Sequence, residues 1–461
     1  MSVIAAFIVP HPPIILPEVG RGKEKEIQKT IDAFKEVAYR IAALKPDTIV
    51  LTSPHTTMYA DYFHISPGET ARGDLGRFGA PAAKIEAAYD SEFVHALAGA
   101  AEQVGLSAGT QGERDNTLDH ATIVPLRFIN EQYNDYKLVR IGLSGLPELD
   151  HYRLGKCIAQ TAEDLNRRVV FVASGDLSHK LTDDGPYGFD EAGPAFDRDI
   201  TTAMAQADFL HFLSFDESFS EAAAECGLRS FIIMAGALDG QAVDSDFLSY
   251  EGTFGVGYGV CAYRVTGDDA SRHFDTIYEN KQAEQIEAAK SGEDAYVRLA
   301  RLSLEIYLKT GKRVQLPDGL PAEMLNRRAG AFVTLKKHGQ LRGCIGTIGP
   351  MTDSIAEEIL RNAVSAGTED PRFPTVTKSE LKDLVYSVDV LAPAEPIQSI
   401  DELDVKRYGV IVSKGYKRGL LLPNLDGVNT PQEQVSIAMQ KGGIQPNEDY
   451  TLERFEVVRH K

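Results

Sequence analysis

Apolar, β-rich runs alternate with helix-like segments through the first 265 residues, and this alternation restricts the fold more than any other feature of the chain. Strands that are apolar on both faces are typical of a sheet that helices cover on both sides. The alternation therefore predicts an α/β domain with a central, mostly parallel sheet. The strand-like runs are Val3–Val9, Thr48–Thr52, Lys137–Leu143, Arg168–Ala173 and Gly259–Val265, and the helix-like segments are Lys23–Leu44, Ser91–Val104, Asp150–Asn166, Asp190–Ala205 and Arg229–Leu238.

A change of composition near Thr266 marks a domain boundary. The stretch Gly267–Ser291 is polar and lacks strand signals, and its middle, Tyr278–Lys290, has the composition of a connecting helix. Boundaries between domains usually fall in such polar stretches. We predict an N-terminal domain over residues 1–265, a linker with a candidate helix over 266–292, and a smaller C-terminal α+β domain over 293–461. The elements expected in the last are a helix at Ala295–Leu308 and strands at Ala331–Leu335, Leu384–Leu391, Gly409–Val412 and Leu420–Leu422.

The chain is acidic, with 48 Lys and Arg against 67 Asp and Glu and a formal net charge of −19. Such a charge repels phosphate backbones and anionic lipid headgroups, so nucleic acid and membrane surfaces are poor candidate partners. No apolar run approaches the roughly 20 residues that span a bilayer. The four cysteines form no CxxC pair, which disfavours a disulfide framework. We expect a cytoplasmic protein; the oligomeric state stays open, a homo-oligomer included.

Histidines follow three of the predicted strands at the point where each strand ends. His11 follows the first strand, His55 the second, and His179 follows the strand that ends at Ala173. In open α/β sheets, ligands bind at the carboxyl ends of the strands. These side chains therefore predict a metal or acid–base site at that edge. A fourth histidine, His120, is placed on a loop before Pro125.

The motifs around these histidines resemble those of the LigB-type, class III extradiol dioxygenases and the related Memo proteins. The motifs are His-Pro-Pro after the first strand, Ser-Pro-His after the second, Asp-His-Ala at 119–121 and Gly-Asp-Leu-Ser-His at 175–179. The resemblance implies an Fe(II) site held by His11, His55 and a carboxylate, with open positions for a catechol-like or aminophenol-like substrate and O₂. It implies that His179 is an acid–base, that His120 orients substrate or oxygen, and that Asp176 polarises His179 or caps the turn.

Two adjacent residues compete for the third ligand position. Glu225 would complete the two-histidine, one-carboxylate set, and the LigB resemblance favours it. Cys226 belongs to a Cys-Gly pair that resembles the Memo proteins, and a thiolate would favour zinc or copper over iron. Adjacent residues do not share a helix face, so one of the two is expected to point away. The carboxylate set favours a ring-cleaving oxygenase, whereas the Memo-like set favours a metal-binding interaction protein without oxygenase activity.

The region from Glu293 to Lys461 resembles the AMME chromosomal region family. The resemblance is carried by Leu-Arg-Gly-Cys-Ile-Gly at 341–346, Glu-Asp-Pro-Arg-Phe-Pro at 369–374 and Arg-Gly-Leu-Leu-Leu-Pro at 418–423. With both domains, the chain resembles the fused proteins of the AmmeMemoRadiSam system, which implies a radical-SAM enzyme as a partner. Arg342 and Cys344 alternate along a predicted strand, so the arginine could lower the pKa of the thiol; the alternative is a small buried residue between glycines. Asp370 and Arg372 are either a catalytic pair or a rigid turn closed by a salt bridge.

Overall fold

The computed structural model describes residues 3–425 and 427–461. Contacts within the chain divide it into two compact units, with the division between Glu279 and Asn280. The helix α10, Phe274–Gly292, contains this division. The polar stretch predicted as a linker begins inside a strand, because Gly267 and Asp268 still pair with Ala242 and Gln241. These residues lie at the exposed end of a hairpin, where a strand needs no apolar side chains.

The N-terminal unit is built on a six-stranded sheet with the order β7-β2-β8-β1-β10-β9. The pairs β7–β2, β2–β8 and β8–β1 are parallel, whereas β10 and β9 add an antiparallel edge. This confirms the α/β fold with a mostly parallel sheet. The six strands are β1 (Val3–Val9), β2 (Thr48–Ser53), β7 (Lys137–Gly142), β8 (Val169–Ser174), β9 (Gln241–Glu251) and β10 (Tyr258–Asp268).

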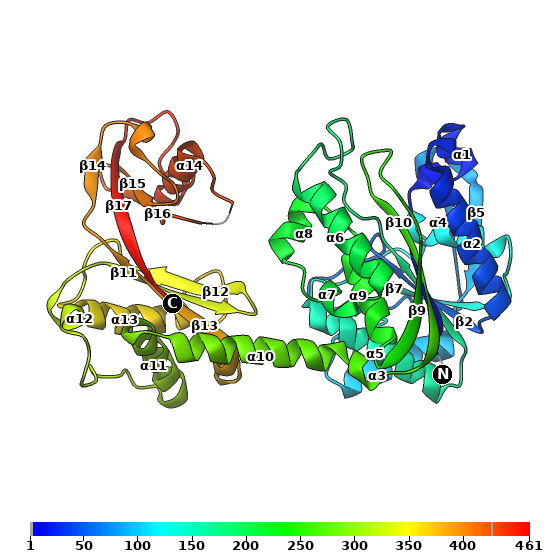
Figure 1. Cartoon of the computed structure of the whole chain (residues 1–461), viewed down its shortest axis with the longest axis horizontal. Helices are drawn as coiled ribbons and strands as arrows, with labels where there is room; N and C mark the ends of the chain where they lie inside the picture. The colour runs from blue at the N-terminus through cyan, green and yellow to red at the C-terminus, as the bar shows by residue number, and fades with distance from the viewer. Residues whose placement is uncertain (1–2, 426) are drawn as a thin grey trace. The chain divides into compact units, whose positions relative to one another are not determined.

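Side chains that alternate along the strands fill two separate cores, one on each face of the sheet. Ala6 and Ile8 of β1 face the first core, whereas Ala5 and Phe7 face the second. Helices α2 and α4 cover the second core, whereas α3, α5, α6, α7, α8 and α9 contribute side chains to the first core on the opposite face (Figure 1). The helices are α2 (Gln28–Leu44), α3 (Ser91–Gln103), α4 (His120–Asn130), α5 (Glu148–Asp164), α6 (Ala192–Gln206), α7 (Phe209–Phe212), α8 (Glu217–Ala223) and α9 (Leu228–Ala237).

The spacing of Lys23–Leu44 predicts one continuous helix, but the structure divides this segment into two elements. Lys23–Ile27 forms a 3-10 turn, and α2 starts only at Gln28. Ile27 has φ −121° and ψ 44°, outside the helical region, and its side chain is fully buried. Packing of Ile27 into the core therefore interrupts the helix. The remaining short elements of this unit are α1 (Pro17–Gly20), the pair β3 (Phe63–His64) and β6 (Ala108–Gly109), and the hairpin β4 (Thr70–Leu75) and β5 (Ala80–Ala88).

The C-terminal unit has an α+β fold with an antiparallel sheet of the order β12-β11-β13-β17-β15-β16, in which β14 also pairs with β17. The strands predicted at 331–335, 384–391, 409–412 and 420–422 all form. The sequence pattern missed β17, because its exposed and half-buried residues carry little apolar signal. The elements are α11 (Ala295–Thr310), α12 (Ala322–Asn326), β11 (Ala331–Lys337), β12 (Gln340–Gly346), α13 (Ile355–Thr368), β13 (Leu384–Leu391), β14 (Glu395–Ile397), β15 (Tyr408–Lys414), β16 (Lys417–Leu421), α14 (Pro431–Gly442) and β17 (Thr451–His460).

Candidate metal centre

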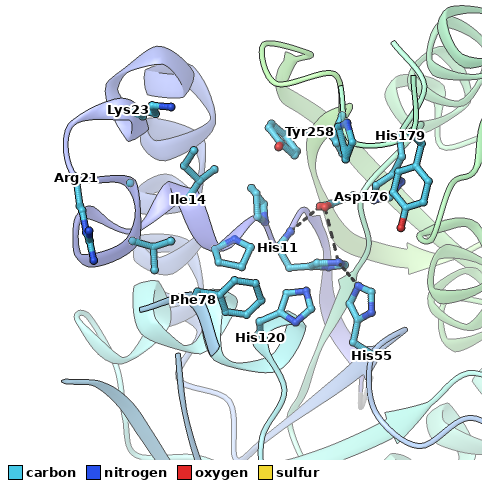
Figure 2. A pocket seen from close by; sticks show the side chains of 17 residues that line it. His11, Ile14, Arg21, Lys23, His55, Phe78, His120, Asp176, His179 and Tyr258 are labelled. Atoms are coloured by element: carbon cyan, nitrogen blue, oxygen red, sulfur yellow. Dashed lines mark hydrogen bonds and ion pairs between the residues drawn. The ribbon is translucent and has the colours of Figure 1, made fainter. Parts of the chain in front are cut away.

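A cavity of about 730 Å³ opens at the carboxyl ends of the parallel strands β1, β2 and β8. Because these three strands are neighbours in the sheet, the residues that follow them meet at one edge. Figure 2 shows His11, His55, His120, Asp176 and His179 around the cavity. The structure therefore brings five of the predicted site residues together.

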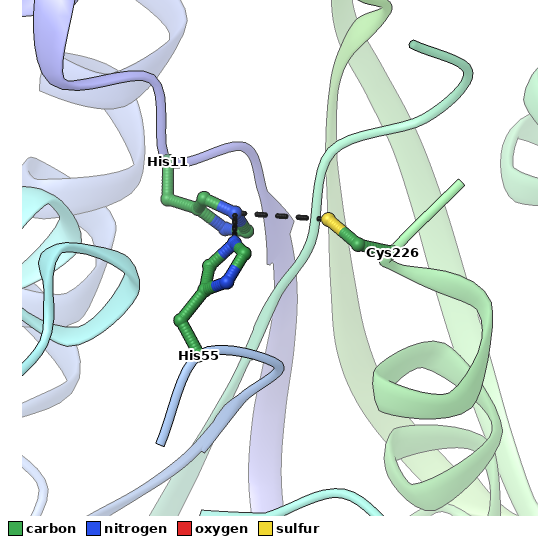
Figure 3. Close-up of side chains that lie close together, drawn as sticks. All are labelled: His11, His55 and Cys226. Carbon is green, nitrogen blue, oxygen red and sulfur yellow. Dashed lines mark hydrogen bonds between the residues drawn. The ribbon is translucent and has the colours of Figure 1, made fainter. Parts of the chain in front are cut away.

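Three candidate ligand atoms form the compact centre of this site. The Nε2 atoms of His11 and His55 are 3.1 Å apart, and Cys226 Sγ lies 3.7 Å from His11 Nε2 (Figure 3). The three atoms lie within 4.8 Å of one another. A tetrahedral centre with metal–nitrogen bonds of about 2.0–2.1 Å and a metal–sulfur bond of about 2.3 Å has edges of about 3.3 Å and about 3.5 Å. The donor set therefore has the chemistry and spacing of a metal site.

The tautomer of His11 follows from two hydrogen bonds of Ser174. The Ser174 hydroxyl donates its proton to the carbonyl oxygen of Ala121 at 2.7 Å. Its oxygen can then only accept from His11 Nδ1, which lies 3.0 Å away. With the proton on Nδ1, the lone pair of His11 Nε2 faces the other two ligand atoms. A hydrogen bond from the other ring nitrogen in this way is what orients metal-binding histidines in proteins.

The Ala121 carbonyl is free for Ser174 because of a proline inside α4. Pro125 lies four residues after Ala121, where an ordinary residue would donate its N–H to that carbonyl. Proline has no N–H, so the helix leaves this acceptor unused. A local feature of the sequence thus determines the proton position on His11, through the hydroxyl of Ser174.

Glu225, predicted as the third ligand, does not lie beside His11 and His55. The Glu225 carboxylate accepts a hydrogen bond of 2.7 Å from the backbone N–H of Leu228, at the start of α9, and lies outside the ligand cluster. Cys226 points to the histidines instead (Figure 3). The two adjacent side chains diverge, as expected for neighbours at a helix start.

A close backbone contact brings Cys226 to the site. A Cβ atom on Gly175 would lie 2.2 Å from the Cα atom of Gly227, so neither position has room for a larger residue there. The Asp176 N–H donates to Cys226 Sγ at 3.3 Å. Burial, together with the carboxylates of Asp176 and Glu225, raises the pKa of the Cys226 thiol well above its ordinary value. Ionisation of this thiol therefore requires a compensating positive charge, such as a metal ion.

Asp176 holds the backbone of His11 instead of polarising His179. Its Oδ1 accepts from the His11 backbone N–H at 2.8 Å, and its side chain is almost fully buried. Burial raises the pKa of this carboxyl to about 7, although the His11 N–H partly offsets the shift. Of the two roles considered from sequence, Asp176 shows neither an interaction with the His179 ring nor a helix cap in the described residues.

His120 is not on a loop, contrary to the expectation from Pro125. It is the first residue of α4, whose N-cap is Asp119. Asp119 Oδ1 also accepts from Ser53 Oγ at 2.7 Å, and Ser53 Oγ accepts from the backbone N–H of His55 at 3.2 Å. The Asp119 carboxylate therefore connects the start of α4 with the turn that carries His55.

All four imidazoles at the site favour the neutral form. Burial lowers the pKa of His11, His55 and His179 and, with a smaller effect of His55, lowers the pKa of His120 to about 4. The rings of His55 and His120 are stacked at 4.3 Å. Neutral imidazoles can bind a metal or accept a proton.

In the C-terminal unit, the expected pairing of Arg342 with the Cys344 thiol is absent. Arg342 does not contact Cys344, because it donates to Glu380 Oε1 at 2.9 Å. Cys344 Sγ lies 3.2 Å from Thr334 Oγ1, and burial raises the pKa of its thiol. Asp370 and Arg372 form an ion pair at 2.7 Å, and Asp370 also accepts from the Cys344 backbone N–H at 2.9 Å. This geometry fits a rigid turn closed by a salt bridge.

Sequence reasoning missed the supporting residues Ser53 and Ser174 and the basic residues Arg21 and Lys23 of the cavity wall. Ser53 and Ser174 are the last residues of β2 and β8, a position that marks the functional edge of the sheet. Nothing in the sequence distinguishes Arg21 and Lys23 from other exposed basic residues.

Comparison with known proteins identifies the families of both units. Residues 5–261 match the family described as the catalytic LigB subunit of aromatic ring-opening dioxygenase, and residues 297–460 match the AMMECR1 family. A protein of Clostridium acetobutylicum is 44% identical over 469 residues, covering the whole of both chains. A protein of Thermotoga maritima is 51% identical over 172 residues, which is 37% of this chain and 99% of the relative. This chain therefore belongs to the LigB family and carries an AMMECR1 domain after its LigB domain.

Two solved structures of uncharacterized proteins were also matched. One, from Pyrococcus horikoshii, is 35% identical and covers 36% of this chain and 89% of its own, with a TM-score of 0.35. The other, from Escherichia coli K12, is 15% identical and covers 57% of this chain and 99% of its own, with a TM-score of 0.38. Among the described residues, no helix has the length and apolar character needed to cross a membrane.

Proposed function

We propose that the LigB domain is a Memo-like metal-binding domain in which His11, His55 and Cys226 hold a soft first-row metal ion, zinc or copper, beside a cavity for a small aromatic molecule. The observation that carries the proposal is the grouping of these three ligand atoms within 4.8 Å. A thiolate with two imidazoles selects zinc or copper ahead of Fe(II). Three protein ligands leave a position open, which is typical of a catalytic centre rather than a closed structural one.

The chain's own residues would prepare this centre for chemistry. Ser174 keeps the proton of His11 on Nδ1, so that Nε2 can donate its lone pair. The rings of His120 and His179 line the same cavity, and burial lowers the pKa of each, which keeps both rings in the neutral form that has a lone pair to accept a proton. When bound, the metal ion would supply Lewis-acid polarisation of a ligand oxygen.

The test is metal selection by the wild-type protein and by three variants. The metal-free protein is offered equal concentrations of Zn²⁺, Cu⁺ and Fe²⁺ under anaerobic, reducing conditions, and bound metal is measured per chain. We expect one zinc or copper ion per chain in the wild type, and loss of that ion in His11→Ala and Cys226→Ala.

Glu225→Gln is the matched control, because it changes the adjacent residue outside the cluster. Circular dichroism checks that each variant is folded. Loss of metal in the Glu225 variant together with retention in the Cys226 variant would reject the thiolate site.

The second candidate function is Fe(II)-dependent ring opening of a catechol-like or aminophenol-like molecule with O₂. It is favoured by the match of residues 5–261 to a family of ring-opening dioxygenases and by the histidines of the cavity. His179 would then be the acid–base, so His179→Gln should keep the metal and lose about 10²–10⁴-fold in rate. Oxygen uptake by the iron-loaded protein with a panel of catechols and aminophenols decides this candidate, and no uptake with any of them rejects ring opening of this substrate class.

A further inference from the structure

The cavity beside the candidate metal centre has a second, basic end. Arg21 and Lys23 line it on the segment after α1, on the opposite side from His179 (Figure 2). The metal-ligand end carries His11 and His55. The cavity therefore has nitrogen ligands at one end and two cationic side chains at the other.

Both cations lack an ion-pair partner within residues 3–425 and 427–461. The acidic side chains next to them in sequence are already engaged. Glu18 pairs with Arg127 at 3.0 Å, and the Glu24 carboxylate accepts from the backbone N–H of Gly22 at 2.6 Å. The wall of the cavity therefore carries two neighbouring cations that form no ion pair with the described residues.

The backbone holds Arg21 at this position. Arg21 has φ 51°, in the left-handed region that few residues other than glycine adopt, and it ends α1. Its guanidinium reaches Gly79, where an added Cβ atom would lie 3.3 Å from Arg21 Nη2. The side chain thus spans from α1 to the turn that carries Phe78, another residue of the cavity wall.

The rest of the cavity lining is largely apolar. It includes Ile14, Val19, Phe78, Val256 and Tyr258, and the carboxylate of Asp176 is the one acidic group among its described residues. That carboxylate accepts a hydrogen bond from the His11 backbone. The cavity therefore also suits an apolar or aromatic body.

We propose that Arg21 and Lys23 form an anion subsite, and that the molecule bound in this cavity carries an oxyanion group, carboxylate or phosphate, on an apolar body whose other end faces His11 and His55. This proposal rests on the proposed function for the position of the metal. The guanidinium fork and the ammonium group are the donors that bind such oxyanions.

The experiment compares three probes that differ in charge. The neutral probe is 4-methylcatechol, its carboxylate counterpart is 3,4-dihydroxyphenylacetate, and the phosphate probe is phenyl phosphate. Binding to the full chain is measured by calorimetry, in the metal-free and the zinc-loaded protein. The variants are the double substitution Arg21→Gln with Lys23→Gln, and Lys25→Gln as the control, since Lys25 is an exposed neighbour that does not line the cavity.

At least one anionic probe should bind about tenfold more tightly than 4-methylcatechol, and the double variant should lose that advantage. Which anion binds identifies the oxyanion. The control should bind like the wild type, and added salt should reduce the advantage because the two cations are exposed. The bound metal of the double variant, measured separately, should equal that of the wild type.

Equal affinity for charged and neutral probes, or no binding of either anionic probe at millimolar concentration, would overturn the anion subsite. Unchanged anion binding in the double variant would overturn it as well. A wild-type protein that binds anions through Arg21 and Lys23 but takes up no metal would instead reject the proposed metal centre and leave the anion subsite intact.

Discussion

At the scale of single residues, the proton position on His11 is the feature on which the metal proposal depends. A histidine binds metal through an unprotonated nitrogen, and Ser174 assigns that role to Nε2 by accepting from Nδ1. The same atom faces His55 Nε2 at 3.1 Å. Two facing imidazole nitrogens need a proton or a metal ion between them, because their lone pairs otherwise repel each other.

Replacement of Ser174 by alanine should weaken metal binding without removing a ligand. We expect a loss of about 10–100-fold in zinc affinity, the usual effect of removing the partner that orients a metal-binding histidine. Competition with a chromophoric chelator measures the affinity. Ser230→Ala is the control, because Ser230 is also buried and donates to the Ser174 carbonyl but touches no ligand. Equal affinities of the two variants would contradict the role of Ser174.

At the scale of elements, helix α4 contributes to the site through an irregularity. Pro125 leaves the Ala121 carbonyl without its helical donor, and Ser174 uses that carbonyl. The first turn of the same helix carries His120 after its Asp119 cap, and Asp119 accepts from Ser53 beside His55. One helix start thus connects the ends of β2 and β8.

Pro125→Ala should separate helix stability from metal affinity. Alanine supplies an N–H for the Ala121 carbonyl and is a better helix former by about 3 kcal/mol in helix interiors, so stability should not fall. The new N–H at position 125 then competes with the Ser174 hydroxyl for the Ala121 carbonyl, and the hydroxyl proton can turn toward His11 Nδ1. We expect zinc affinity to drop toward that of Ser174→Ala, while urea denaturation shows unchanged or higher stability. Wild-type affinity in this variant would show that the proline has no part in orienting His11.

Helix α5 contains a buried histidine whose protonation opposes folding. His151 is fully buried, its Nδ1 lies 3.1 Å from the Pro147 carbonyl, and burial lowers its pKa to about 3 from an ordinary value of 6.5. Because the folded-state pKa is depressed, the unfolded chain binds the proton first as the pH falls. The stability that this residue contributes is therefore present above pH 6.5 and is lost progressively between 6.5 and about 3.

His151→Gln should flatten the pH dependence of stability. We expect the slope of unfolding free energy against pH, between pH 6.5 and 4, to fall by up to about 1.4 kcal/mol per pH unit. Urea denaturation of the metal-free protein at several pH values measures the slope. His95→Gln, a change on the exposed face of α3, serves for comparison and should keep the wild-type slope. A wild-type slope in the His151 variant would refute the assignment.

At the scale of the whole molecule, the boundary between the two compact units and the start of the AMMECR1 match fall at different residues. The two units divide after Glu279, whereas the AMMECR1 match starts at 297. Between these points, Asp294 caps α11 by accepting from the N–H groups of Tyr296 and Val297, and it also pairs with His460 of β17. The structural unit therefore begins before the matched region.

A fragment of residues 280–461 should fold by itself with a cooperative thermal transition. A fragment of residues 297–461 lacks the Asp294 cap and the Glu293–Arg301 ion pair, so its Tm should be lower by several degrees. Circular dichroism melting curves compare the two fragments. An unfolded longer fragment would show that the C-terminal unit needs the LigB domain, and equal Tm values would show that the Asp294 contacts add nothing.

The sequence by itself determined the α/β fold of the first unit, the α+β fold of the second, and the edge at which His11, His55 and His179 meet. The spacing of apolar residues along the chain is enough for these predictions. Apolar strands predict a sheet covered on both faces, and the residues that follow parallel strands share one edge of it. Only the tertiary structure shows that Cys226, and not Glu225, faces the histidines, because this placement depends on the contact of Gly175 with Gly227 across distant segments. The partners of Arg342 and the basic end of the cavity were likewise decided by packing, since a side chain's neighbours in space leave no periodic signal along the chain.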